Sequence, residues 1–156
     1  MRQRKYLKQV TLGVTLAITL LVLPACSESS RSKSAPDFRT AVRHHLDSVE
    51  NRDLETFRST LTQSDELFVI FPGGSLLDST QSVIDFHRDW FKDQDWVFET
   101  EIVKTILGET QSTALVKYEF RDTVNGPARQ AWLVLTFQLE DGSWRLIHDQ
   151  NTRIEN

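Results

Sequence analysis

The feature of this sequence that most constrains its fold is a run of four segments in which apolar and polar residues alternate. The segments span about 96–107, 113–124, 128–139 and 144–152. Alternation with a period of two is typical of half-buried β-strands. Two of the connections contain a dipeptide, Asn125-Gly126 and Asp141-Gly142, that favours a two-residue type I′ hairpin. The pattern therefore predicts a four-stranded antiparallel meander.

The two turns also predict which residues lie opposite each other. A turn at Asn125-Gly126 places Tyr118 opposite Leu133, and a turn at Asp141-Gly142 places Leu133 opposite Gln150. Because side chains alternate between the two faces of a strand, one face is expected to carry Val116, Tyr118, Phe120, Leu133, Leu135, Phe137, Leu139, Trp144, Leu146, His148, Gln150 and Thr152. Apolar walls with a few convergent polar groups are typical of a ligand pocket. The alternative for His148 is a packed histidine with both ring nitrogens hydrogen-bonded.

The residues before the meander predict helices. Phe38, Val42, Leu46 and Val49 recur at the spacing of one helix face. Asp53 can cap a second, short helix.

One strand and a third helix follow. The segment ELFVIFPGG, residues 66–74, predicts a strand that ends in a Pro-Gly-Gly turn. Asp78 and Gln81 have the spacing of a capping box. The third helix is expected to direct Val83, Phe86, His87, Trp90 and Phe91 inward. Helices followed by a meander predict an α+β fold, in which a curved antiparallel sheet wraps two to three N-terminal helices.

Residues 1–25 predict a lipoprotein signal peptide. Basic residues precede an uncharged apolar stretch, 10–23, that is shorter than the roughly 17–25 residues of a membrane-spanning helix. The stretch ends in Leu-Pro-Ala-Cys at 23–26, which resembles the bacterial lipobox, although Pro24 is a less typical residue at its position. We expect cleavage before Cys26 and lipidation of that cysteine. An ordinary signal peptide that happens to contain a cysteine is the alternative.

Residues 26–36 predict a lipidated cysteine followed by a flexible tether. Cys26 is the only cysteine of the chain, so no intrachain disulfide is available, and the serine-rich segment after it has no apolar periodicity. The expected location is the bacterial cell envelope, with the protein anchored to the membrane by lipid. Ser27 after the cysteine implies the periplasmic side of the outer membrane in a double-membrane bacterium. The formal net charge of −4 gives no indication of a nucleic-acid partner.

The element order and the last strand resemble the SnoaL-like branch of the nuclear-transport-factor-2-like superfamily. The matching residues of the last strand are Gly142, Trp144, Arg145, Leu146, His148, Gln150 and Thr152. The resemblance covers about 38–154 and implies a cone-shaped, cystatin-like α+β domain, here 37–156, with a deep pocket and frequent dimers. The fold hosts isomerases, cyclases and hydrolases as well as binding domains. Gln150 stands where the family usually has a second histidine, which removes one acid–base group.

The ligand pocket is expected to be lined by Phe71, Trp90, Tyr118, Leu133, His148 and Gln150. His148 is the only candidate catalytic residue, and no carboxylate partner for it is visible in the sequence. We therefore expect a non-catalytic module that binds a small apolar ligand or associates with itself. The alternative is a SnoaL-type enzyme that uses His148 for acid–base chemistry.

Neither a metal nor a cofactor is expected. His44 and His45 are neighbours on a helix, so they point apart, and we expect both to be solvated. His87 has no second ligand at metal-binding spacing, and there is no phosphate-binding loop.

The sheet face opposite the pocket predicts a homodimer. Trp132, Val134 and Ile147 lie on this face, where exposed apolar side chains indicate an interface. The alternative is that the tether or the C-terminus covers them.

Overall fold

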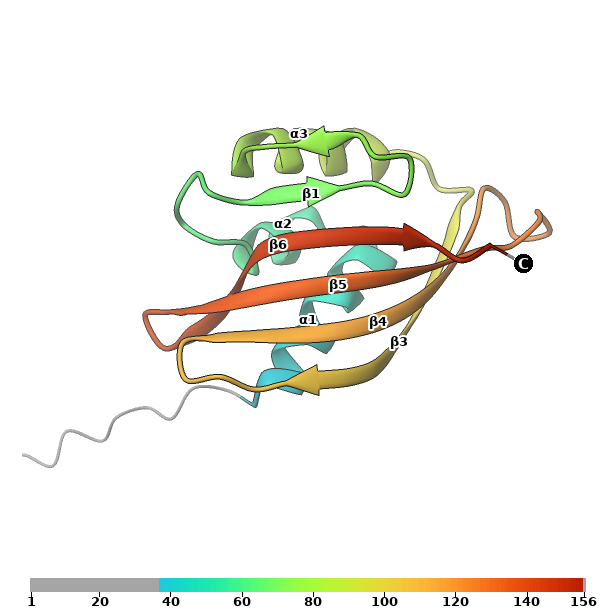
Figure 1. Cartoon of the computed structure of the whole chain (residues 1–156). Coiled ribbons are helices and arrows are strands. Elements are labelled where there is room, and N and C mark those ends of the chain that lie inside the picture. Colours follow the sequence, from blue (N-terminus) through green and yellow to red (C-terminus); the bar gives the residue numbers. More distant parts are fainter. Residues whose placement is uncertain (1–36, 156) are drawn as a thin grey trace, which may run out of the picture. The chain divides into compact units, whose positions relative to one another are not determined.

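The computed structural model describes residues 37–155, which form three helices and six strands (Figure 1). The helices are α1 (Phe38–Glu50), α2 (Leu54–Ser59) and α3 (Thr80–Trp90). The strands are β1 (Phe68–Ile70), β2 (Leu76–Leu77), β3 (Val97–Ile106), β4 (Gln111–Arg121), β5 (Arg129–Glu140) and β6 (Ser143–Arg153). The predicted meander is therefore present as β3 to β6.

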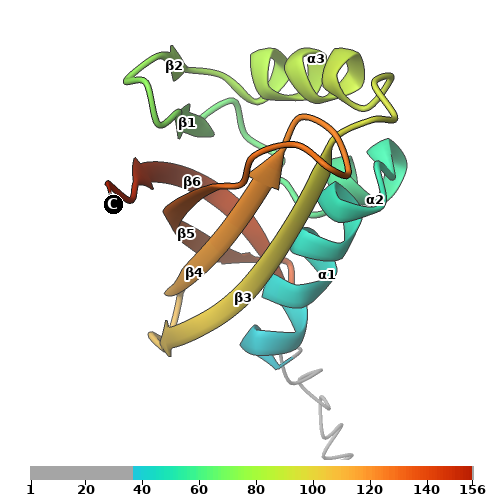
Figure 2. The same ribbon diagram turned by 90° about the vertical axis from the view of Figure 1, so that its right-hand side faces the viewer.

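All six strands form one curved, open sheet in the order β2-β1-β6-β5-β4-β3. The sheet curves around α1 and α2, and α3 lies on the side of β1 and β2 (Figure 2). This confirms the predicted α+β fold. The sheet is mixed rather than wholly antiparallel, because β1 pairs in parallel with β6.

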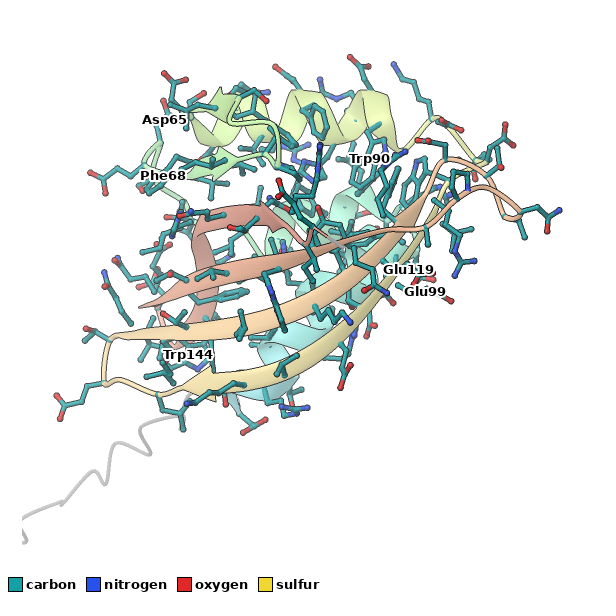
Figure 3. All side chains as sticks on the ribbon, turned by 45° about the vertical axis from the view of Figure 1, so that its right-hand side comes forward. Asp65, Phe68, Trp90, Glu99, Glu119 and Trp144 are labelled. Atoms are coloured by element: carbon teal, nitrogen blue, oxygen red, sulfur yellow. The ribbon has the colours of Figure 1, made fainter. Side chains whose placement is uncertain are left out.

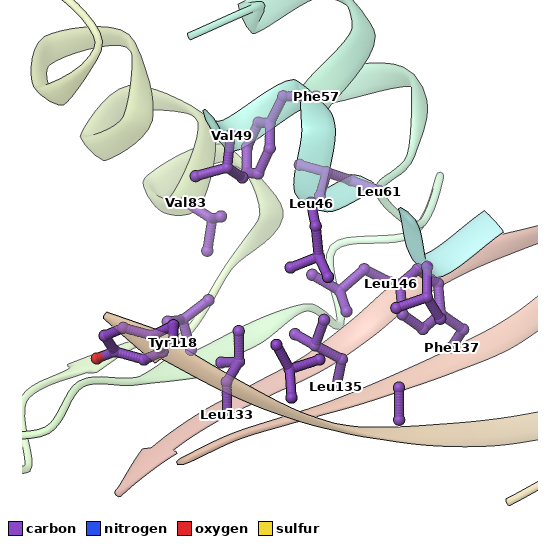
Figure 4. Close-up of a cluster of buried hydrophobic side chains, with 14 of the residues drawn as sticks. Leu46, Val49, Phe57, Leu61, Val83, Tyr118, Leu133, Leu135, Phe137 and Leu146 are labelled. Carbon is purple, nitrogen blue, oxygen red and sulfur yellow. The ribbon is translucent and has the colours of Figure 1, made fainter. Parts of the chain in front are cut away.

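Side chains that point toward each other from the helices and the sheet form the core (Figure 4). Leu46 and Phe57 from the helices and Leu135, Phe137 and Leu146 from the sheet are almost completely buried. Burying an apolar side chain of this size stabilises the fold by about 1.5–3 kcal/mol.

Aspartate and serine side chains set the starts of the helices. Asp37 accepts a hydrogen bond from the Thr40 backbone N–H (2.9 Å), and Asp53 accepts one from the Thr56 N–H (3.0 Å). Asp53 is thus the predicted cap of α2, since a side-chain oxygen satisfies an N–H group that the helix leaves free.

The capping residue predicted for α3 is wrong by one position. Ser79, not Asp78, is the N-cap, and it forms a reciprocal capping box with Ser82. With Ser79 as the cap, Gln81 is one residue short of the N3 position that a capping box uses, and its side-chain amide donates to Asp85 (2.8 Å) instead.

The first hairpin has a longer loop than the Asn125-Gly126 sequence predicts. Tyr118 pairs with Ala131 rather than with Leu133. The turn closes through the Gly126 N–H, which donates to the Thr123 carbonyl (2.8 Å), and Pro127 has no N–H for a strand ladder. The pairing register differs from the prediction by two residues. Because side chains alternate faces with a period of two, each one keeps its predicted face.

The second hairpin begins as predicted. Asp141 and Gly142 both have positive φ angles, 49° and 77°, as a type I′ turn requires. Leu139 then pairs with Trp144, and the ladder continues in the predicted register to Phe137.

A β-bulge at Ile147 changes the register of the rest of β6. Beyond it, Thr136 pairs with His148 and Leu135 pairs with Asp149. One extra residue in a strand moves every later side chain to the other face. The register predicted beyond Phe137 is therefore wrong by one residue.

The bulge lies where β6 changes its neighbour on the edge away from β5. Before the bulge, Leu146 exchanges backbone hydrogen bonds with Thr60 (2.8 Å) and Thr62 (3.0 Å). After it, His148 pairs with Phe68 of β1. The extra residue thus separates two parallel pairings that involve different segments of the chain.

Candidate active site

A cavity of about 290 Å³ lies between the concave face of the sheet and the helices. Most of its wall is apolar. Its lining includes Leu46, Val49, Phe57, Val69, Phe71, Val83, Phe86, Trp90, Phe98, Phe120, Ala131, Leu133 and Leu146, together with the polar residues His45, His87, Tyr118, Arg129, Gln130, Asp149, Asn151 and Arg153. Mostly apolar walls with a few polar groups are typical of small-molecule sites.

A stacked aromatic pair supports one wall of the cavity, which Trp90 lines. Trp90, near the end of α3 (Figure 3), stacks on Trp96 with 4.4 Å between ring centroids. The Trp96 indole N–H donates to the Trp90 carbonyl (3.2 Å), and the Arg52 guanidinium lies 3.6 Å from the centre of the Trp96 ring. Cation–π and ring contacts of this kind hold Trp90 in place.

Asp149 is the acidic residue of the cavity wall. The bulge at Ile147 directs Asp149 and Asn151 to the concave face. The Asn151 side-chain amide donates to Asp149 Oδ1 (2.8 Å) and to the Ile70 carbonyl (3.0 Å). These bonds use both amide hydrogens, and the carboxyl accepts no other hydrogen bond within residues 37–155. Asp149 Oδ2 is thus left available to a molecule in the cavity.

The environment of Asp149 places its proton equilibrium near neutral pH. The residue as a whole keeps some solvent access, but its carboxyl is surrounded by protein, and this burial raises the pKa to about 7 against the smaller opposing effect of the Asn151 hydrogen bond. Desolvation acts in this direction because it disfavours the charged carboxylate. Both forms of Asp149, the carboxylic acid and the carboxylate, are therefore populated at physiological pH.

Tyr118 supplies a hydroxyl group that stays protonated. Burial, followed by the negative charge of Asp149, raises its pKa to about 12, while Arg129 and Arg153 act in the opposite direction. The hydroxyl makes no hydrogen bond to any residue in the described part of the chain. Because the charge of Asp149 affects the pKa of Tyr118, both side chains lie in the same part of the cavity lining.

Two arginines lie at the exposed end of the lining. Arg129 forms a bidentate ion pair with Asp122 (2.6 and 2.7 Å). The Arg153 side chain forms no hydrogen bond or ion pair with other residues between 37 and 155. Both are exposed, so the cavity opens to solvent beside them, where the end of β6 lies beside the start of β5 and the Ile154 N–H donates to the Gln130 carbonyl (3.0 Å).

Two buried histidines lie in the cavity wall. His45 is only 3% exposed, which contradicts the expectation that it is solvated, whereas His44 is exposed as expected. Position 45 follows Val42 by one helical turn and precedes Leu46 and Val49. The helical spacing of these apolar residues could therefore have placed His45 in the core.

Four of the residues predicted for the pocket line this cavity: Phe71, Trp90, Tyr118 and Leu133. His148 and Gln150 do not line it. The His148 ring packs at a tilt against the Phe68 ring on the other side of the sheet, with 4.4 Å between centroids, and Gln150 is exposed. The physical reason is the bulge, which turns these two residues outward and brings Asp149, Asn151 and Arg153 inward.

The other predicted sites have different outcomes. Cys26 and the tether lie outside the described residues. Trp132 is 36% exposed on the convex face, and Val134 and Ile147 are partly buried. Their role in a dimer stays a prediction.

Residues 37–155 contain no group of three or more His, Cys, Asp or Glu side chains that could hold a metal ion. Among the same residues, no helix is both long and apolar enough to span a membrane.

Solved structures of other proteins share this fold. A candidate calcium/calmodulin-dependent protein kinase type II association domain from Thiobacillus denitrificans is 16% identical, with a TM-score of 0.68 over 78% of this chain and 98% of the other. A ketosteroid isomerase-like protein from Erwinia carotovora atroseptica is 13% identical, with a TM-score of 0.62 over 76% and 94%. An LEH-like epoxide hydrolase from M. tuberculosis is 18% identical, with a TM-score of 0.57 over 74% and 80%.

At these identities, the likeness establishes the fold and not an activity. Comparison with curated protein sequences gives no match. Proteins of the nuclear-transport-factor-2-like superfamily are among the similar structures. The model of the SnoaL-like domain family matches residues 39–151, and the chain therefore belongs to this family.

Proposed function

We propose that this domain binds a small, largely apolar molecule in its cavity and exchanges a proton with it through Asp149. The observation that carries the proposal is the state of the Asp149 carboxyl. Asn151 holds one oxygen at 2.8 Å, and the other makes no hydrogen bond within the described residues. Burial raises the pKa to about 7. A general acid or base works best when its pKa is near the working pH.

Tyr118 complements Asp149 in this chemistry. The Asp149 carboxylate would take a proton from a carbon beside a carbonyl group, and the electron pair of that C–H bond would move to the carbonyl oxygen. The protonated Tyr118 hydroxyl would donate a hydrogen bond to this oxygen and stabilise its developing charge. Asp149, now a carboxylic acid, would return the proton. His148 is not part of this proposal, because it lies on the opposite face of the sheet.

The similar structures support an acid–base role by analogy alone. An epoxide hydrolase and a ketosteroid isomerase-like protein are among them. A candidate association domain is also among them. The fold is thus compatible with catalysis and with assembly, and the chemistry of the cavity favours catalysis.

Binding without turnover is the second candidate function. It is favoured by the aromatic wall around Trp90 and by the small number of polar groups in the cavity. It retains the expectation of a ligand-binding module made from the sequence, with Asp149 in place of His148 and Gln150 as the polar contact.

The location and assembly of the protein are part of the same proposal. Lipid on Cys26 would hold the protein at the cell envelope, on the periplasmic side of an outer membrane where one exists. The convex sheet face, with Trp132, Val134 and Ile147, would join two copies. In both cases the cavity stays on the concave side, open to molecules that diffuse in the envelope.

Proton exchange can be measured without knowledge of the natural substrate. The protein would be incubated in D2O with apolar ketones, from cyclohexanone to 2-tetralone, and deuterium uptake beside the carbonyl would be followed by NMR. We expect exchange above the buffer rate, and we expect Asp149→Asn to abolish it. Asp85→Asn, on the exposed face of α3, is the matched control and should exchange at the unmodified rate.

The possible results separate the two functions. Bound 2-tetralone without exchange would favour the binding module. Equal exchange by Asp149→Asn and the unmodified protein would refute the role of Asp149.

A further inference from the structure

The hydrogen bonds around His45 determine which of its ring nitrogens carries the proton. His45 Nδ1 lies 2.7 Å from Thr60 Oγ1. The Thr60 hydroxyl has a single hydrogen, which it donates to the Phe57 carbonyl (2.6 Å). Thr60 must therefore accept from His45, so Nδ1 bears the hydrogen. Nε2 of His45 is then an unprotonated acceptor.

The same reasoning applies to His87. Its Nδ1 lies 2.8 Å from the Val83 carbonyl oxygen, which can only accept. Nδ1 is again the donor, and Nε2 again carries a lone pair.

Neither lone pair has a partner among residues 37–155. Both side chains line the cavity, and the Phe57 ring contacts both of them, at 5.4 Å from His45 and 4.1 Å from His87 between centroids. Burial lowers the pKa of His45 to about 3 and that of His87 to about 4. Both rings are therefore neutral at physiological pH.

An unpaired acceptor in an apolar wall discriminates between ligands. A ligand with an O–H or N–H group at this place supplies the missing donor. A ligand that carries only an acceptor or a methyl group there displaces any water and leaves the nitrogen unpaired. A site built to bond a hydroxyl rejects analogues that lack it more strongly than it rejects a change in apolar size.

From this geometry we infer that the cavity takes an apolar molecule bearing a hydroxyl group, and that Nε2 of His45 or of His87 accepts the hydrogen bond that this hydroxyl donates. The inference rests on the proposed function, since it assumes that the cavity binds a ligand. It goes beyond it by adding a hydroxyl group to the apolar, carbonyl-bearing ligand and by giving the two histidines a specificity role. Asp149, on β6, would contact a different part of the same molecule.

Two matched probes test the inference. 2-Naphthol and 2-methoxynaphthalene share the same ring system, but only 2-naphthol can donate a hydrogen bond. Isothermal titration calorimetry on the whole protein should show about tenfold tighter binding of 2-naphthol, as expected when a buried acceptor gains its partner. Equal affinities would overturn the inference and leave cavity binding intact. Failure of both probes to bind would also overturn the inference, while the proposed function is judged separately by the deuterium exchange of the ketones.

Variants identify the residues responsible. His45→Phe and His87→Phe, alone and combined, keep an aromatic ring beside Phe57 but remove the acceptors. In the double variant, the ratio of the affinity for 2-naphthol to the affinity for 2-methoxynaphthalene should fall toward one. Each preference is a ratio measured within one protein, so a general loss of stability cancels.

His44→Phe, at the exposed histidine next to His45, is the control variant, and it should retain the preference. If Asp149→Asn abolished the preference and the double histidine variant kept it, Asp149 would be the group that recognises the hydroxyl, and the inference would be wrong.

The protonation states can be measured independently. Nitrogen-15 NMR of the imidazole rings in the free protein should show protonated Nδ1 and unprotonated Nε2 for both histidines. Addition of 2-naphthol should shift the Nε2 signal of at least one ring. Protonated Nε2 atoms in both free rings would contradict the inference without any ligand.

Discussion

Replacement of Asp149 by asparagine should make the protein more stable at alkaline pH. Asparagine has nearly the same shape, and its carbonyl oxygen can accept the same hydrogen bond from Asn151. The change removes the cost of burying a carboxylate, which appears when the group ionises. Folding raises the pKa of Asp149 from 3.8 to about 7, so the folded state binds the proton more tightly than the unfolded state does.

The sign and size of the effect follow from this difference in pKa. The contribution of Asp149 to stability is complete below pH 3.8 and is lost as pH rises to about 7. Between pH 5 and pH 8, the loss covers about two pH units at 1.36 kcal/mol each, or about 3 kcal/mol. The unmodified protein should lose this amount relative to Asp149→Asn.

Urea unfolding followed by tryptophan fluorescence can measure the difference at both pH values. His45 and His87 also titrate differently in the folded and unfolded states, but they do so in both proteins, so their contribution cancels. Asp85→Asn controls for the loss of one negative charge. If the free energies of unfolding of Asp149→Asn and the unmodified protein changed in parallel between pH 5 and pH 8, the buried, protonated state of Asp149 would be refuted.

Three other predictions concern residues outside the cavity. Cys26→Ser should prevent lipidation and release the protein from membranes; intact-mass analysis of the membrane fraction decides this, and an unmodified Cys26 in a soluble mature protein would contradict it. Trp132→Glu should weaken a dimer formed through the convex face, as measured by sedimentation, and a monomeric unmodified protein at high micromolar concentration would exclude that dimer. His148→Ala should lower stability by about 1 kcal/mol through loss of its contact with Phe68 and leave 2-naphthol affinity unchanged; a large change in affinity would place His148 at the ligand.

Local sequence signals predicted most of the fold because they act over short distances. Strand alternation and Asp141-Gly142 gave the correct start of the last hairpin. The two-residue error at Asn125-Gly126 left Tyr118 on its predicted face, because side chains alternate with a period of two. Asp53 was found as a cap because its partner, Thr56, is three residues away.

The polar part of the site was harder to predict because its geometry depends on distant pairings. Asp149 and His148 are adjacent, so one of them must face the cavity, and the choice depends on whether the strand contains an extra residue. The turn at Asp141-Gly142 fixes the register only as far as Phe137. No residue near Ile147 has the positive φ angle or the glycine that accompanies some bulges.

The position of the bulge links the fold to the proposed chemistry. β6 pairs with residues 60–62 up to Leu146 and with β1 from His148 onward. The same strand β1 provides the Ile70 carbonyl that accepts from Asn151 (3.0 Å), and Asn151 in turn holds Asp149. The parallel pairing of β1 with β6 thus begins at the bulge, and it also holds Asn151, the residue that orients the Asp149 carboxyl. The family resemblance, which includes His148, indicates the correct strand. The residues of that strand that face the cavity are Asp149 and Asn151, on the opposite face from His148.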